Sequence, residues 1–226
     1  MMILAVDTSG DSGSVALLNG SSLMTGSFLP AEGRRHAQTL VGEVDRVLAE
    51  ASLSPIDVDV VAVSIGPGSF TGLRVGCVFA KTFAWCNQAR LAAVDTLQAW
   101  ARHSQLGGEV IRVISDAQRK EVFCRDYDAH TLNPISDLGI RPLKDVAEPS
   151  GSGSLQVTGP GVSQFEGQLP AASCEYVPLP EPALLAPDVG AIAELYVAAG
   201  DIADVAALEP VYVRRSYAEE KRDQAV

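Results

Sequence analysis

The sequence predicts an α/β protein of two lobes, each built from a mixed sheet with packing helices. Three short apolar runs joined by tight turns open the chain, and they predict an antiparallel meander of strands. Stretches with helical spacing then alternate with further apolar runs, an order typical of helices that cover a sheet. At Leu106-Gly107-Gly108 the order of paired strands followed by a helix begins again. These three observations favour two small lobes over one large domain.

In the first half of the chain, apolar runs predict strands, and apolar stripes at helical spacing predict helices. The expected strands are residues 3–6, 13–18, 21–29, 58–65 and 91–94, and the expected helices are residues 37–51, 72–88 and 96–103. Asn19-Gly20 is a type I′ hairpin signal between the second and third strands. The helix at 72–88 is apolar on more than one side, so something besides its own sheet must cover it.

The second half repeats this order less regularly. We expect strands at 109–114, 120–127 and 155–158, loops at 142–154 and 159–161, a helix at 189–199, and a short strand or extended arm at 211–214. Five prolines between 170 and 187 exclude long regular elements there. The predicted lobes are residues 1–105, carrying the dimerisation helices, and a smaller lobe at 106–226. This duplicated order is the pattern of the actin-like ATPase (ASKHA) superfold.

Charge and cysteine usage narrow the function classes. The chain carries 17 Lys and Arg against 28 Asp and Glu, a formal net charge of -11, which repels phosphate backbones. We therefore expect no direct binding of tRNA or DNA by this chain alone. The four cysteines form no Cys-x-x-Cys pair, the N-terminus has no signal-peptide pattern, and no apolar run reaches the length of a membrane span. The expectation is a cytoplasmic protein with reduced thiols.

Two segments rich in small residues follow predicted strands. Asp7, Thr8 and Ser9 open a turn that can cradle an anion, because small residues let backbone N–H groups approach a phosphate. The plain alternative is a hairpin turn, since any turn prefers these residue types. We take Asp7, Thr8 and Ser9 as candidates for a nucleotide or anion contact.

The second segment joins a buried strand to a helix. Gly68, Ser69 and Thr71 complete the candidate nucleotide or anion contact, because they precede a helix N-terminus whose N–H groups can hold an anion. No Gly-Lys-Ser/Thr follows, so the segment is not a P-loop. The alternative is a tight loop whose glycines serve packing.

Several segments together resemble one family. Ser-Ile-Gly-Pro-Gly-Ser-Phe-Thr-Gly-Leu-Arg-Val-Gly at 64–76 closely resembles the hallmark segment of the TsaB/YeaZ family. The segments at 3–9, 35–40, 116–123 and 210–214 are similar to its N-terminal strand, its first helix, its Asp-Ala-Arg-x-x-Glu-Val-Tyr motif and its Pro-x-Tyr-Leu-Arg motif. The motif at 116–123 departs in two positions, and residues 140–205 carry little resemblance.

The resemblance implies an actin-like fold and a non-catalytic, scaffolding role in forming N6-threonylcarbamoyladenosine in tRNA. Proteins of this kind pair with a catalytic TsaD-type subunit and a TsaE-type ATPase, and we expect a homodimer when the chain is alone. The catalytic relative holds a metal with two histidines one turn apart. Here His36 is followed four residues later by Leu40, so we expect no metal, no cofactor and no catalytic residues in this chain.

The apolar helices at 34–51 and 72–88 then become the predicted partner interface, because they carry more apolar surface than one sheet can cover. We expect Leu40, Val44, Leu73, Val75, Val78 and Phe79 to be among the buried or contact positions of this interface. A competing hypothesis is an enzyme acting by itself: an actin-like ATPase or sugar kinase using the turn at 7–13, or a glycoprotease. Thr158-Gly159-Pro160-Gly161 is the one candidate for an adenosine-binding loop in the second lobe.

Overall fold

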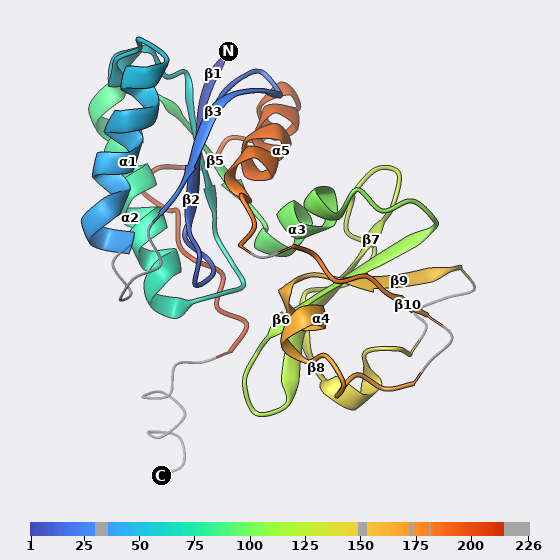
Figure 1. The fold of residues 1–226 in the computed structure, drawn as a ribbon. Helices are drawn as coiled ribbons and strands as arrows, with labels where there is room; N and C mark the ends of the chain where they lie inside the picture. The colour runs from blue at the N-terminus through green and yellow to red at the C-terminus, as the bar shows by residue number, and fades with distance from the viewer. Residues whose placement is uncertain (30–35, 149–152, 172–173, 181, 215–226) are drawn as a thin grey trace.

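A computed structural model gives the fold of the chain, and it describes residues 1–29, 36–148, 153–171, 174–180 and 182–214. The chain forms two lobes, each with a five-stranded mixed sheet (Figure 1). The expected start of the first helix at Arg35 and the tail after Tyr217 lie outside the described ranges.

The first sheet has the strand order β3-β2-β1-β4-β5. Its strands are β1 (Met2–Asp7), β2 (Ser14–Asn19), β3 (Ser22–Phe28), β4 (Val60–Ser64) and β5 (Arg90–Val94). β1, β2 and β3 pair antiparallel, which confirms the predicted meander, whereas β4 and β5 add in parallel to β1. Every residue of β4 is buried, because helices cover both faces of this part of the sheet.

The second sheet repeats this topology with the order β8-β7-β6-β9-β10. Its strands are β6 (Val110–Asp116), β7 (Glu121–Asp128), β8 (Gly139–Pro142), β9 (Leu155–Thr158) and β10 (Glu175–Tyr176). Again three strands pair antiparallel and two add in parallel. The second sheet thus repeats the strand order and pairing of the first, which confirms the predicted actin-like fold class.

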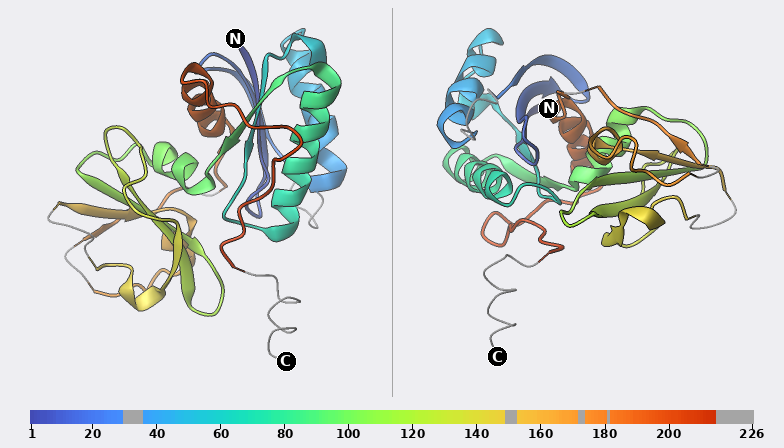
Figure 2. Two further views of the ribbon diagram at one scale, coloured as in Figure 1. Left: turned by 180° about the vertical axis from the view of Figure 1, so that it is seen from behind. Right: turned by 60° about the horizontal axis from the view of Figure 1, so that its bottom comes forward.

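Helices pack on both faces of the first sheet. α1 (His36–Glu50) and α2 (Phe70–Asn87) cover one face, and α5 (Ala186–Ala198) covers the other (Figures 1 and 2). The short helices η1 (Pro55–Asp57) and η2 (Leu143–Asp145) lie in connections. No helix in the described part of the chain is both long and apolar enough to cross a lipid bilayer.

The helix that ends each half packs against the sheet of the other half. α3 (Thr96–Ser104) buries Leu97 and Ala101 with residues of β6 and β7, and α5 buries Val189 and Ile192 against the first sheet. α4 (Pro160–Gln164) covers the opposite face of the second sheet. A boundary near residue 105 therefore separates the two sheets but not the helices that cover them. Apolar burial, rather than chain order, decides which sheet each helix joins.

A buried ion pair fixes the second lobe. The guanidinium of Arg112 on β6 donates to both carboxylate oxygens of Asp126 on β7 at 2.7 and 2.8 Å, and both side chains are fully buried. Arg112 also donates to the carbonyls of Val146 and Glu148, which ties the segment after η2 to the sheet. Burial opposes the charge of Arg112, but Asp126 outweighs it, so the pKa of Arg112 is raised.

Two elements differ from expectation. β8 falls at the edge of the expected loop at 142–154, because pairing with β7 supplies its hydrogen bonds in spite of Gly139 and Pro142. The expected turn at 159–161 opens α4, with Pro160 in the first turn, where its missing N–H costs nothing. Residues 211–214 form an extended arm, the second of the two forms expected for them.

Candidate functional site

The turn after β1 is organised by the carboxylate of Asp7. Its Oδ1 accepts hydrogen bonds from the backbone N–H of Ser9 at 3.0 Å, from the Ser9 hydroxyl at 2.6 Å and from the Ser64 hydroxyl at 2.6 Å. All three residues are buried. This oxygen is thus engaged within the protein, and it links the ends of β1 and β4.

The same turn docks onto the start of α2. The Ser69 N–H donates to the Ser9 carbonyl at 2.7 Å, and the Thr8 hydroxyl donates to the Gly72 carbonyl at 2.8 Å. The Ser69 hydroxyl caps α2 by accepting from the Gly72 N–H. Two donors that could hold an anion, the Ser69 N–H and the Thr8 hydroxyl, are therefore used to join the two segments.

The six residues expected to contact a nucleotide or anion are only partly brought together. Ser9, Gly68 and Ser69 line a common cavity, whereas Asp7 and Thr8 are buried behind it and Thr71 is exposed outside it. The observed hydrogen bonds of Asp7 and Thr8 therefore fit the plain alternative, in which these residues serve the turn itself. A direct ligand contact stays a prediction for Ser9, Gly68 and Ser69.

That cavity is a cleft of about 980 Å³ between the lobes. One wall consists of the turn at 9–12 and the segment 67–70, and the other consists of the β6–β7 turn at 115–118 and residues of α4. Trp100 of α3 and the arm at 211–214 also line it. The segments that resembled family motifs at 3–9, 64–76, 116–123 and 210–214 all reach this cleft.

Charged, polar and aromatic side chains all line the cleft. Its charged lining side chains, within the described residues, are Asp11, Asp116 and Arg214. Asp116 accepts hydrogen bonds from the Gln118 side chain at 2.9 Å and from the Gln164 side chain at 2.8 Å, so it bridges β6 and α4. Aromatic rings of Phe70, Trp100, Phe123 and Tyr212 complete the lining. Such a cleft can hold a polar molecule with a flat ring, but two carboxylates oppose a polyphosphate.

The arm at 211–214 spans both lobes. The Val211 N–H donates to the Ile65 carbonyl at 2.7 Å, which fixes the arm to the first lobe. Arg214 forms an ion pair with Glu121 of β7, which fixes it to the second lobe. Sequence reasoning left the arm without a role. Its two attachments show that it closes one side of the cleft.

The predicted partner residues divide between core and surface. Leu40, Val44 and Leu73 are at most 5% exposed and belong to the core under α1 and α2, so they are buried members of the predicted set. Val75 and Phe79 are half-buried, and Val78 is 63% exposed. A side chain already packed against the sheet has no surface left for a partner.

Two exposed apolar residues complete the outer surface of these helices. Val41 on α1 is 65% exposed and Trp85 on α2 is 79% exposed. We call Val41, Val78 and Trp85, with the half-buried Val75 and Phe79, the α1–α2 face. Val41 and Trp85 were within the predicted helical stripes but absent from the predicted contacts. Large exposed apolar residues on adjacent helices are typical of interaction surfaces.

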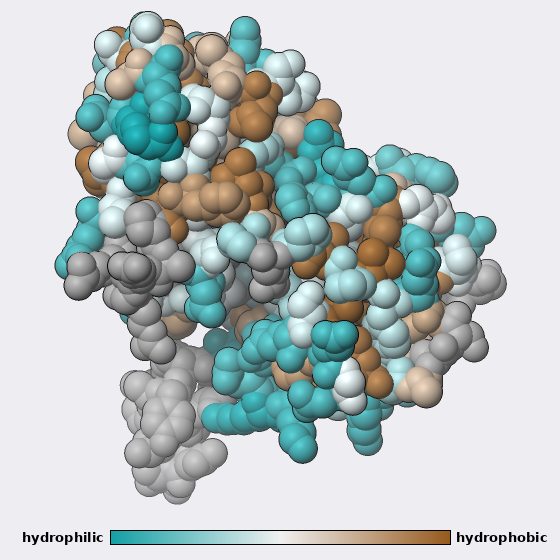
Figure 3. Space-filling view, in the orientation of Figure 1, coloured by the Kyte–Doolittle hydropathy of each residue, from teal (hydrophilic) through white to brown (hydrophobic). Residues whose placement is uncertain are grey.

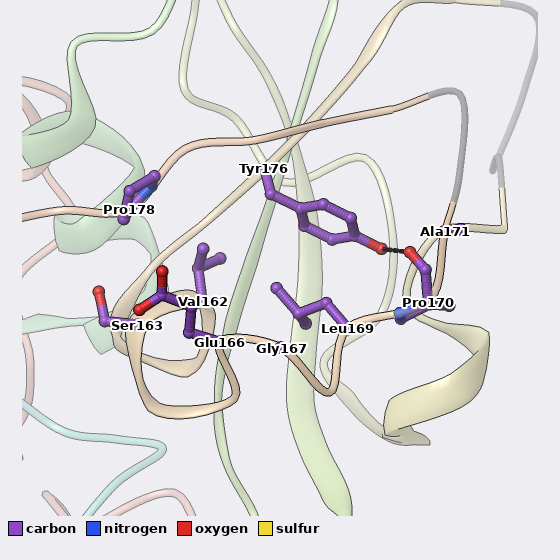
Figure 4. A pocket seen from close by; sticks show the side chains of 9 residues that line it. All are labelled: Val162, Ser163, Glu166, Gly167, Leu169, Pro170, Ala171, Tyr176 and Pro178. Carbon is purple, nitrogen blue, oxygen red and sulfur yellow. Dashed lines mark hydrogen bonds between the residues drawn. The ribbon is translucent and has the colours of Figure 1, made fainter.

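In the view of Figure 3, the surface of the second lobe carries both hydrophilic and hydrophobic residues. Over the second lobe, Figure 3 shows hydrophilic atoms along most of the lower edge, with small and separate apolar patches. The second lobe also has a shallow cavity of about 500 Å³, which is lined by α4 and the segment after it (Figure 4). Within it the Tyr176 hydroxyl donates to the Pro170 carbonyl at 2.9 Å, and burial raises its pKa to about 12. Glu166 is its one charged lining residue among those described.

Side chains that could bind a metal ion or act as a nucleophile are scattered over the described part of the chain. Among the described residues, no three His, Cys, Asp or Glu side chains gather closely enough to hold a metal ion. His103 pairs with Asp188 at the start of α5 at 2.8 Å. Burial raises the pKa of the Cys77 and Cys124 thiols to about 11, so both are poor nucleophiles near neutral pH.

Comparison with known proteins places these features in a family. The family model of TsaD, tRNA N6-adenosine threonylcarbamoyltransferase, matches residues 24–137, half of the chain. The chain is 32% identical over 127 residues to the tRNA threonylcarbamoyladenosine biosynthesis protein TsaB of Bacillus subtilis. It is also 32% identical over 129 residues to TsaB of Escherichia coli. Each match covers 56% of this chain and 55% of the relative, so the chain spans about half the length of the curated relatives it matches.

Similarity in structure extends further along the chain. The solved structure of YeaZ from Pseudomonas aeruginosa superposes with a TM-score of 0.80 at 26% sequence identity, covering 93% of this chain and 99% of that one. The superposition includes both lobes, whereas the sequence matches are confined to about half of the chain. With the family model and the TsaB relatives, it shows that this chain belongs to the TsaB/YeaZ family.

Proposed function

We propose that this chain is the non-catalytic, activating subunit of a cytoplasmic complex that forms N6-threonylcarbamoyladenosine in tRNA. In that complex it pairs with a TsaD-type catalytic subunit and a TsaE-type ATPase. The names of its TsaB relatives support the pathway. The observation that carries the subunit role is the α1–α2 face, where Val41, Val78 and Trp85 are each more than 60% exposed.

The energetics of this face favour a partner. Two exposed aliphatic side chains and an exposed indole on adjacent helices lose contact with water when a second surface covers them, which contributes roughly 25 cal/mol for each Å² of apolar area. The helices beneath are already packed on the sheet through Leu40, Val44 and Leu73. A rigid platform of this kind needs little ordering on binding, so most of the burial energy goes into affinity.

The same face suits two assemblies. A second copy of the chain would cover it in a homodimer, and the catalytic subunit would cover it in a heterodimer. Both cannot occupy one surface, so we propose that the two assemblies exclude each other. The tRNA contacts then lie on the assembled complex, because the chain carries a net charge of -11.

A non-catalytic role agrees with the local chemistry. Leu40, one helical turn after His36, is 2% exposed and belongs to the core. The turn at 7–9 and the start of α2 use their hydroxyl and amide groups on each other. These contacts support a structural use for segments that would otherwise bind a reacting group.

The test uses purified TsaD-type and TsaE-type proteins from the same organism and the Val78→Glu variant. We expect size-exclusion chromatography to show a complex with the unmodified chain and none with Val78→Glu. Ile56→Glu is the matched control, because Ile56 is equally apolar and 68% exposed but lies on η1. Complex formation by Val78→Glu would contradict the proposed surface.

Competition tests mutual exclusion. Excess catalytic subunit should convert the homodimer into the heterodimer at constant chain concentration, as read by multi-angle light scattering. A homodimer that persists, or a ternary assembly containing two copies of this chain, would show that the surfaces differ.

The cleft supports a second candidate, an ATPase acting by itself. Its volume of about 980 Å³ is large enough for a nucleotide, although Asp11 and Asp116 oppose the phosphates. Calorimetric titration with ATP and magnesium decides between the two. Tight binding with turnover by the isolated chain would favour the enzyme. The absence of heat and of product, together with activity gained only in the complex, would favour the subunit.

A further inference from the structure

Arg74 of α2 stacks on the ring of Phe70 and lies beside that of Tyr212, next to the α1–α2 face. Its guanidinium carbon lies 3.9 Å from the centroid of the Phe70 ring, and its Nε–H donates to the Tyr212 hydroxyl at 2.9 Å. The Phe70 and Tyr212 rings are 4.5 Å apart. Stacking and the hydrogen bond fix the plane of the guanidinium, although the side chain is exposed.

The outer half of this guanidinium has no partner in the described part of the chain. Its Nη1 and Nη2 make no hydrogen bond or ion pair there, and α2 contains no Asp or Glu. The other cations of the two helices are engaged: Lys81 donates to the carbonyls of Ala206 and Leu208, and Arg46 pairs with Glu43 and Glu50. Arg74 therefore presents a rigid, unpaired fork of N–H donors.

Position and chemistry together indicate what this fork binds. Arg74 precedes Val78 by one helical turn and Trp85 by three, so all three lie along one side of α2. A planar guanidinium fork matches the two oxygens of a carboxylate and binds them in parallel hydrogen bonds. Apolar neighbours strengthen such a pair once a partner excludes water from it.

We propose that Arg74 receives an Asp or Glu carboxylate of the protein that docks on the α1–α2 face, and so selects that partner. This inference rests on the proposed function of the face. A nucleic acid phosphate would fit the same fork, but the net charge of -11 and the apolar neighbours favour a protein.

Tyr212 is the positioning residue for this contact. Its hydroxyl accepts from Nε and leaves the Nη atoms directed away, and its place is fixed because the Val211 N–H binds the Ile65 carbonyl. The arm thus prepares Arg74 in advance, which lowers the ordering cost when the partner binds. The arm also lines the cleft, so the cleft and the docking face share one structural element.

The experiment measures dissociation of this chain from the purified TsaD-type subunit by surface plasmon resonance. Arg74→Lys keeps the charge and removes the fork, and we expect dissociation to accelerate by at least about tenfold. Tyr212→Phe keeps the ring and removes the acceptor, with an expected acceleration of about threefold. Arg90→Lys, exposed at the start of β5, is the control and should match the unmodified chain. Thermal unfolding should be unchanged in all three.

A double-mutant cycle identifies the carboxylate. Each exposed Asp or Glu on the partner's docking surface is changed to Asn or Gln, alone and with Arg74→Lys. One of them should lose its effect in the Arg74→Lys background.

The inference has clear contradicting outcomes. Equal dissociation rates for Arg74→Lys and the unmodified chain would overturn it, provided that Val78→Glu still abolishes binding. If Val78→Glu also binds normally, the proposed function itself fails. Weaker retention of tRNA with unchanged protein affinity would assign the fork to nucleic acid and also overturn it.

Discussion

Gly72 lies directly against Thr8, and this contact joins the first strand to the helix of the docking face. A Cβ atom added at Gly72 would lie 2.0 Å from the Thr8 carbonyl oxygen, and one added at Gly68 would lie 2.4 Å from that of Ser9. Real Cβ atoms do not approach backbone oxygens this closely, so either the turn or α2 would have to move.

Gly72→Ala should therefore lower the free energy of unfolding by about 3 kcal/mol. Chemical denaturation followed by circular dichroism measures this change. Gly42→Ala is the matched control, because Gly42 is also helical but has no neighbour within 4 Å of the added methyl. That control should raise stability by roughly 0.5–1 kcal/mol. Equal effects of the two substitutions would show that the close contact with Thr8 does not constrain α2.

Asp126→Asn tests the buried ion pair of the second lobe. The substitution leaves the Arg112 charge without its carboxylate in a site where both side chains are fully buried. We expect a loss of roughly 3–5 kcal/mol in the free energy of unfolding, because an uncompensated buried charge is costly. Asp137→Asn, at an exposed position, should change stability by less than about 0.5 kcal/mol. A similar small effect at Asp126 would mean that water reaches Arg112.

Most of the fold could be predicted from the sequence because its strands are short apolar runs and its helices have regular stripes. β8 could not, since Gly139 and Pro142 weaken its pattern and its stability comes from pairing with β7. The sequence also does not predict that α3 packs on the second sheet and α5 on the first. Both helices are apolar, and only the packed structure decides which sheet each one covers.

The candidate site was predictable only in part. The pattern marked α2 as apolar on two sides, but it could not tell which side meets the sheet. Leu73 therefore seemed as good a contact as Val78, although one is 1% and the other 63% exposed. Arg74 was not among the predicted contacts, because Tyr212, which orients it, lies 138 positions later in the chain. A contact over that distance has no local signal.

Thiol labelling tests the burial of the cysteines. With a pKa of about 11, the Cys77 and Cys124 thiols are ionised in about one molecule in a thousand at pH 8. Because burial raises their pKa, their reactivity should grow only as the pH rises toward 11. Cys86 is exposed, so iodoacetamide should modify it first, as read by mass spectrometry of peptides. Modification of Cys77 at the rate of Cys86 would show that α2 opens from the sheet.

Trp85 provides a direct reporter of the docking face. The chain has two tryptophans, and Trp100, whose ring lies edge-on to that of His103, is half-buried. In the Trp100→Phe variant, the fluorescence of Trp85 alone should shift to shorter wavelength when the catalytic subunit binds, because its indole leaves water. The affinity gives a second readout of the same contact: Trp85→Ala should weaken binding by about 2 kcal/mol, as expected for a central aromatic contact.

The fluorescence experiment needs its own control. The Trp85→Phe variant is the control, because any shift that remains in it comes from Trp100 or from the partner. An unshifted spectrum in a complex proven by chromatography would place Trp85 outside the interface and move the docking surface toward Arg74 and Tyr212.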